Sequence, residues 1–171
     1  RVGLRDCVEV ELGQWSLQSP FLSRIGSDAL VEMILPDVVE LTKALIAAKS
    51  ITPAHGTVFD VLEAALLPLG FTVDRFVAGE APDGPVENLL AVRTAGPGPH
   101  FAFAGHLDVV PPGEGWTSGA FEPEIRGDLL YGRGAVDMKG SIAAFAAALA
   151  TLPAAGTVSL IITGDEGGPA P

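Results

Sequence analysis

Residues 157–164 read Thr-Val-Ser-Leu-Ile-Ile-Thr-Gly, an almost continuous apolar run with the length of a single strand. A run of this kind is typical of a strand that is buried on both faces of its sheet. Such a strand needs covering layers, and the flanking sequence supplies helical patterns that can provide them. We therefore predict an α/β fold, a three-layer sandwich with a mixed, largely parallel sheet flanked by helices.

The patterns in the rest of the chain agree with this interpretation. Apolar residues recur at helical spacing in three segments, at residues 37–50, 57–70 and 138–152. Strand patterns occur in four further segments, at residues 71–78, 87–95, 100–105 and 129–134. Pro36 and Asp37 mark the start of the first helix, and Gly70 marks the end of the second. Ser50, Thr52 and Pro53 are interpreted as residues that end the first helix.

Composition excludes several classes of protein. Hydrophobic residues make up 48% of the 171 residues and charged residues 18%, which is enough for a core and argues against intrinsic disorder. The net charge of −11 repels phosphate backbones, so we expect no nucleic-acid partner. The sequence has no apolar stretch of about 18 residues and no signal-peptide pattern at its start, so we expect no contact with membranes. The single cysteine, Cys7, agrees with a reducing cytoplasm.

Polar side chains follow two of the predicted strands at the point where each strand ends. His106 and Asp108 come directly after one strand, and Glu166 follows another. A third acidic position, Asp137, precedes the Ala-rich helix. Because ligands of open α/β sheets bind outside the carboxyl ends of the strands, we expect these residues to converge on one edge of the sheet.

The residue types at these positions are those of a metal site. Residues two apart in an extended chain point the same way, so Asp108 can accept the second ring N–H of a metal-bound His106. Asp137 can either cap a helix or bridge two cations. Glu166 is suited to act as the base for a metal-bound water. A surface His–Asp pair and a solvated acidic loop remain the alternatives for these motifs.

Longer motifs then make the sequence recognisable. GHLDVVPPG, W-x-x-x-x-F-x-P, YGRGAVDMKGS and the final Asp-Glu occur in this order, and VVELTKALIAAKSITP precedes them. From about Asp37 to Ala170 the chain resembles the succinyl-diaminopimelate desuccinylases, which belong to the co-catalytic zinc metallopeptidase and aminoacylase superfamily. The resemblance implies a partial zinc-peptidase-like catalytic domain.

The resemblance also assigns roles to individual residues. It implies that His106 ligates zinc, that Asp108 orients His106, and that Asp137 bridges two zinc ions. A cis peptide is expected directly after the bridging residue, between Asp137 and Met138. Glu166 would be the general base that takes a proton from the attacking water. The expected cofactor is Zn²⁺, two ions per intact subunit, with Co²⁺ as a possible substitute.

The implied reaction is the hydrolysis of N-succinyl-LL-2,6-diaminopimelate to succinate and LL-2,6-diaminopimelate. This step serves lysine and diaminopimelate biosynthesis in the bacterial cytoplasm, and the full-length enzyme is expected to be a homodimer with a small-molecule substrate. An acetylornithine deacetylase-like enzyme or a metallo-carboxypeptidase remains an alternative. An alternative of another class is a non-catalytic chain, either truncated or degenerate.

The sequence departs from the family in two respects. Gly167 stands where the family has a second glutamate, which ligates zinc, and the remaining ligands and the dimerisation domain are not present in the 171 residues. We interpret residues 1–35 as an unplaced extension and residues 36–171 as the N-terminal part of the catalytic domain. We expect weak zinc binding, no activity of this chain alone, and association through an exposed edge at residues 157–164.

Overall fold

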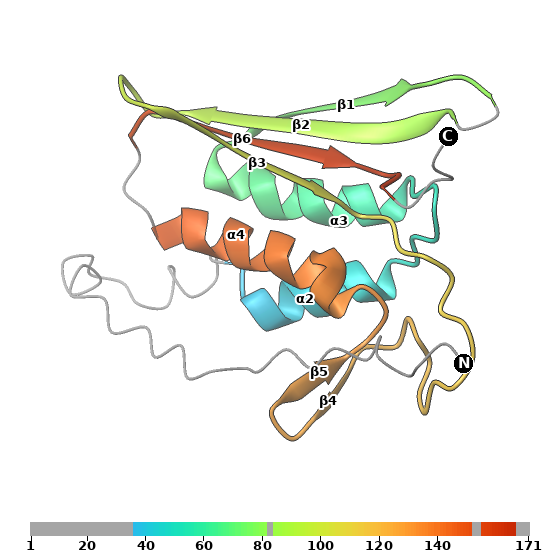
Figure 1. Cartoon of the computed structure of the whole chain (residues 1–171). Coiled ribbons are helices and arrows are strands. Elements are labelled where there is room, and N and C mark those ends of the chain that lie inside the picture. Colours follow the sequence, from blue (N-terminus) through green and yellow to red (C-terminus); the bar gives the residue numbers. More distant parts are fainter. Residues whose placement is uncertain (1–35, 82–83, 152–154, 167–171) are drawn as a thin grey trace.

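The computed structural model describes residues 36–81, 84–151 and 155–166. Its main sheet has four strands in the order β1–β2–β6–β3. The strands are β1 (Thr72–Ala78), β2 (Val86–Thr94), β3 (His100–His106) and β6 (Thr157–Thr163). Three helices, α2 (Val38–Ala47), α3 (Thr57–Leu66) and α4 (Gly140–Thr151), lie together on one side of this sheet (Figure 1).

The predicted α/β fold with a mixed sheet and flanking helices is confirmed, but parallel pairing is less extensive than expected. Strand β3 pairs with β6 in parallel, whereas β1–β2 and β2–β6 are antiparallel. A short connection between β1 and β2 permits only antiparallel neighbours, while the long path from β3 to β6 contains α4 and allows a parallel crossover. Within the described residues the helices cover one face of the sheet.

Strand β6 is an interior strand, so the expectation that it forms an exposed edge is wrong. It pairs with β2 on one side and with β3 on the other, and the edges of the described sheet are β1 and β3. Leu160 and Ile162 are fully buried on the helix-covered face, whereas Ile161 is 52% exposed. The apolar run correctly predicted a strand with a buried face, but the expected burial of both faces is not seen among the described residues, because Ile161 is exposed.

The predicted helix limits agree with the structure. The Asp37 carboxylate accepts hydrogen bonds from the backbone N–H groups of Val39 (2.8 Å) and Glu40 (2.9 Å), and so satisfies the free donors at the start of α2. Helix α3 continues into the 3-10 turn η2 (Leu67–Leu69). Gly70 then adopts a left-handed conformation with φ of 83°, which ends the helical segment.

The core lies between the helices and the sheet. Its fully buried members come from both the helices and the sheet and include Leu45, Phe59, Leu62, Leu160 and Ile162. Among the helices of the described residues, none is both long and apolar enough to cross a membrane.

Three elements beside this core belong to the neighbourhood of the site. A two-stranded sheet pairs β4 (Glu124–Arg126) with β5 (Leu129–Tyr131), and β4 was absent from the sequence-based expectation. A short kinked turn, η3 (Ala135–Lys139), in which Asp137 and Met138 have non-helical backbone angles, then leads directly into α4. This turn carries Asp137 towards the end of β3.

Candidate functional site

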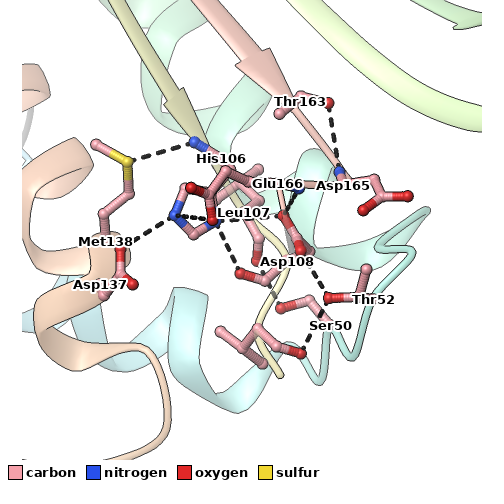
Figure 2. A network of polar contacts seen from close by, with 11 residues as sticks. Ser50, Thr52, His106, Leu107, Asp108, Asp137, Met138, Thr163, Asp165 and Glu166 are labelled. Atoms are coloured by element: carbon pink, nitrogen blue, oxygen red, sulfur yellow. Dashed lines mark hydrogen bonds and ion pairs between the residues drawn. The ribbon is translucent and has the colours of Figure 1, made fainter. Parts of the chain in front are cut away.

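The four predicted site residues gather at the carboxyl ends of β3 and β6. His106 is the last residue of β3 and is paired with Thr163 of β6, so the two strand ends lie side by side. Nε2 of His106 is 3.1 Å from Oδ1 of Asp137 and 3.7 Å from Oε2 of Glu166. Figure 2 shows the imidazole between these carboxylates. The parallel β3–β6 pair therefore brings together residues from three distant parts of the sequence.

Asp108 occupies the other side of the imidazole ring. Nδ1 of His106 is 3.0 Å from the backbone oxygen of Asp108 and 3.2 Å from its carboxylate Oδ1. The hydrogen bond to the Asp108 carboxylate, assisted by Asp137, raises the pKa of His106 to about 9, although burial opposes this rise. With Nδ1 engaged in this way, Nε2 is the ring nitrogen that faces the cavity. The orienting role of Asp108 stays a prediction, and the geometry is the one that it requires.

A cavity of about 320 Å³ lies in front of these groups. Its lining includes Trp116 and Arg133 as well as His106, Asp137 and Glu166. The Asp137 and Glu166 side chains are 82% and 64% exposed, whereas that of His106 is 9% exposed. The site thus consists of a buried imidazole and two accessible carboxylates at the wall of an open cavity.

The chain around Asp137 is held from two sides. A cis peptide joins Asp137 to Met138, as the resemblance predicted. The sulfur of Met138 accepts a hydrogen bond from the backbone N–H of His106 (3.4 Å). Lys139 is fully buried, its Nζ donates to the backbone oxygen of Leu45 (2.6 Å), and burial lowers its pKa to about 8. Lys139 therefore holds the end of α2 against the segment that carries Asp137.

Thr52, predicted only as a residue that ends the first helix, lies at the site in the structure. The Thr52 hydroxyl donates to Oδ2 of Asp108 (2.6 Å), and the backbone N–H of Glu166 donates to Oδ1 of the same carboxylate (3.0 Å). No periodic pattern could have indicated the Thr52 contact, because its partner lies 56 residues further along the chain. Asp108 is thus bonded to the segment between α2 and α3 and to the segment after β6.

The donor set fits part of a metal centre. An imidazole nitrogen and carboxylate oxygens are common zinc ligands, and Nε2 of His106 faces Asp137 in a suitable arrangement. Within residues 36–81, 84–151 and 155–166, however, no group of three or more His, Cys, Asp or Glu side chains could hold a metal ion. His106 and Asp137 alone fall short of the three or four protein ligands typical of zinc sites. Gly167, the departure from the family pattern, lies outside the described residues.

Comparisons with known sequences agree with the predicted resemblance. Residues 102–170 match the model of peptidase family M20/M25/M40. The chain is 75% identical over 135 residues to a succinyl-diaminopimelate desuccinylase of Sphingopyxis alaskensis. The match covers 78% of this chain and 36% of that relative. It is 71% identical over 136 residues to the enzyme of the same name from Novosphingobium aromaticivorans, with 78% and 36% covered. The resemblance to succinyl-diaminopimelate desuccinylases is confirmed, and the chain spans about a third of the length of these relatives.

Solved structures share the fold. Human carnosine dipeptidase 1 is 24% identical with a TM-score of 0.64, and the match covers 80% of this chain and 33% of that one. The M20 family metallo-carboxypeptidase Sso-CP2 from Sulfolobus solfataricus is 20% identical with a TM-score of 0.61, covering 74% and 30%. At these identities the similarity establishes the fold, in agreement with the predicted fold class.

Proposed function

We propose, from the resemblance of this chain to the M20/M25/M40 peptidases and the succinyl-diaminopimelate desuccinylases, that it carries part of the active site of a metal-dependent amidohydrolase. The proposed reaction converts N-succinyl-LL-2,6-diaminopimelate into succinate and LL-2,6-diaminopimelate. The observation that carries this proposal is the high identity to the Sphingopyxis alaskensis relative over most of this chain. The gathering of His106, Asp137 and Glu166 around one cavity supports it.

In this proposal each residue has a defined task. Nε2 of His106 and the Asp137 carboxylate, which lie 3.1 Å apart, would hold zinc, or cobalt in its place, and two ions are expected per intact subunit. When bound, the metal would polarise the amide carbonyl and acidify water. Asp108 keeps Nδ1 of His106 engaged, so that Nε2 faces the cavity. Glu166 accepts the proton of the attacking water and delivers it to the leaving amine.

The proposal extends to the whole protein. Residues 36–171 form the N-terminal part of a catalytic domain in an enzyme with a small-molecule substrate. The intact enzyme is a homodimer in the bacterial cytoplasm. With only His106 and Asp137 as ligands, the 171-residue chain binds zinc weakly and is inactive by itself.

A chimera tests the proposed reaction. Residues 36–171 replace the matching segment of the Sphingopyxis alaskensis relative, and release of succinate from N-succinyl-LL-2,6-diaminopimelate is measured beside hydrolysis of N-acetylornithine. We expect succinyl substrate to be preferred, and Glu166→Gln to abolish turnover while the chimera stays folded. Preference for the acetylated substrate would instead favour the acetylornithine deacetylase-like alternative.

The same chimera also tests the non-catalytic alternative, which is supported by the glycine at position 167. Gly167 replaces an expected ligand, so the chimera with Gly167→Glu should bind more zinc and turn over faster than the unmodified chimera. Inactivity of both chimeras would support a degenerate chain. Equal zinc content in both would argue that Gly167 is not the lost ligand position.

A further inference from the structure

A five-residue segment connects the two strand ends that carry the site. Residues 50–54, called the strap here, run past the end of β3, where Figure 2 shows Ser50 and Thr52 beside Leu107 and Asp108, and their last residue contacts the segment after β6. The backbone N–H of Thr52 donates to the oxygen of Val109 (3.2 Å), and the N–H of Ala54 donates to the oxygen of Gly164 (2.6 Å). The strap therefore fixes the spacing between the segment that follows His106 and the segment that precedes Glu166.

The backbone of the strap is held in place without the help of the Thr52 side chain. Ser50 is buried, and its hydroxyl donates to the backbone oxygen of Leu107 (2.7 Å). At the other end, a Cβ atom on Gly164 would collide with the backbone oxygen of Ala54, so the two backbones are in close contact. A substitution that removes only the Thr52 hydroxyl should leave the strap where it is.

The Thr52 hydroxyl acts on a carboxylate that already serves two functional groups. It donates to Oδ2 of Asp108 at 2.6 Å, while Oδ1 accepts from the Glu166 backbone N–H at 3.0 Å and lies 3.2 Å from Nδ1 of His106. Asp108 is 2% exposed, so water cannot readily replace a lost donor. The carboxylate plane, once fixed through Oδ2, also fixes where Oδ1 meets the two groups around the cavity.

We propose that Thr52 is a positioning residue of this site. Its hydroxyl sets the rotation of the Asp108 carboxylate, and through Oδ1 it sets the relative placement of the His106 ring and the Glu166 backbone. The inference rests on the proposed function, because it assigns Thr52 to the metal-dependent site. A carboxylate that has lost one buried donor turns towards its remaining donors, and the His106–Glu166 arrangement changes with it.

Matched substitutions in the 171-residue chain test this inference. Thr52→Val keeps the shape and removes the hydroxyl, whereas Thr52→Ser keeps the hydroxyl. In the metal-free chain, NMR reports the Glu166 amide proton and the His106 ring nitrogens, and Co²⁺ titration reports metal affinity. We expect Thr52→Val to shift both sets of signals and to weaken Co²⁺ binding about 10-fold, at the low end for groups outside the metal ligands. Thr52→Ser should restore the signals and affinity to within about twofold of wild type.

Two further variants serve as controls for the Thr52 substitutions. Thr94→Val is the control, because the Thr94 hydroxyl faces that of Thr157 (3.2 Å) at the opposite end of the strands, and it should change neither readout. Thr52→Ala, which also lacks the hydroxyl, should reproduce the effects of Thr52→Val. Unchanged Glu166 and His106 signals in Thr52→Val would overturn the inference, as would a Thr52→Ser variant that is disturbed equally.

Failure of the inference can be told apart from failure of the proposed function. The NMR comparison needs no metal and tests the Thr52–Asp108 coupling directly. A wild-type chain that binds no Co²⁺, or an inactive chimera with Gly167→Glu, would contradict the proposed function instead. Metal binding by wild type and by Thr52→Val with equal affinity would overturn the positioning role.

Discussion

Ile162 and Glu166 are only four residues apart, yet they belong to regions that are held together differently. Ile162 is fully buried in the cluster shared by the helices and the sheet, whereas the Glu166 side chain is 64% exposed at the cavity. The core is stabilised by many non-directional contacts, so the stabilising free energy is distributed over many residues. The site depends on single hydrogen bonds, such as the one from Glu166 N–H to Asp108. We therefore expect stability and metal binding to respond to different substitutions.

The largest loss of stability is expected inside the core. Ile162→Ala should lower the free energy of unfolding by about 2–5 kcal/mol, because it leaves a cavity among fully buried neighbours. Ile161→Ala, at a position 52% exposed on the same strand, is the matched control and should cost about 0.5 kcal/mol or less. Urea unfolding followed by circular dichroism measures both. Equal losses would mean that the two faces of β6 are covered alike.

Asp108 is where the two regions are expected to overlap, because it is both buried and polar. Asp108→Asn keeps the shape but replaces one of the two carboxylate oxygens that accept from Thr52 and Glu166 with an NH2 group, which cannot accept. The free energy of unfolding should fall by about 1.5–3 kcal/mol. Affinity for Co²⁺ should fall about 10–100-fold. Urea unfolding and Co²⁺ titration give the two numbers. A fall in the unfolding free energy alone would assign Asp108 to the core, and a fall in Co²⁺ affinity alone would assign it to the site.

A directional bond outside the site should affect stability only. Asp37→Ala removes the cap of α2 and should cost about 1 kcal/mol of unfolding free energy. Asp37→Asn retains a side-chain acceptor and should recover most of that loss. Co²⁺ titration should give the wild-type affinity for both variants. Weaker metal binding in Asp37→Ala would show that loss of the α2 cap also changes the geometry of the site.

The smallest change in stability is expected at Asp137, although it is one of the two proposed metal ligands. Asp137→Asn alters a carboxylate that is 82% exposed, so the metal-free chain should keep its unfolding free energy within about 0.5 kcal/mol. Added Co²⁺ should stabilise the wild-type chain against heat but leave Asp137→Asn unchanged, because only a bound ion shifts the folding equilibrium. Equal protection of both would remove Asp137 from the proposed ligands.

The local parts of the fold could be predicted because their signals are local. Asp37 and Gly70 mark helix ends through their own side chain or backbone, and the apolar run marks residues 157–163 as a strand with a buried face. The direction of its neighbours could not be obtained in this way, because a buried strand has the same pattern beside parallel and antiparallel partners. Strand β4 reads Glu-Ile-Arg and has a single apolar residue, so it gives no strand pattern, whereas the equally short β5 reads Leu-Leu-Tyr.

The site was predictable to the extent that polar residues at strand ends reveal it. His106 ends β3, Asp108 and Glu166 follow β3 and β6, and the structure brings all three together with Asp137. Thr52 was missed because a threonine after a helix resembles many ordinary turn residues. Its importance in the geometry comes from a contact across the fold, which residue spacing does not encode.

The parallel pairing of β3 with β6 has a consequence for the order of folding. In the sequence, the β4–β5 pair, η3 and all of α4 lie between these two strands. Closing so long a loop costs chain entropy, and contacts distant in sequence form slowly. We therefore expect the helices and the β1–β2 hairpin, whose contacts are closer in sequence, to form first. The cavity is then among the last features of the molecule to assemble.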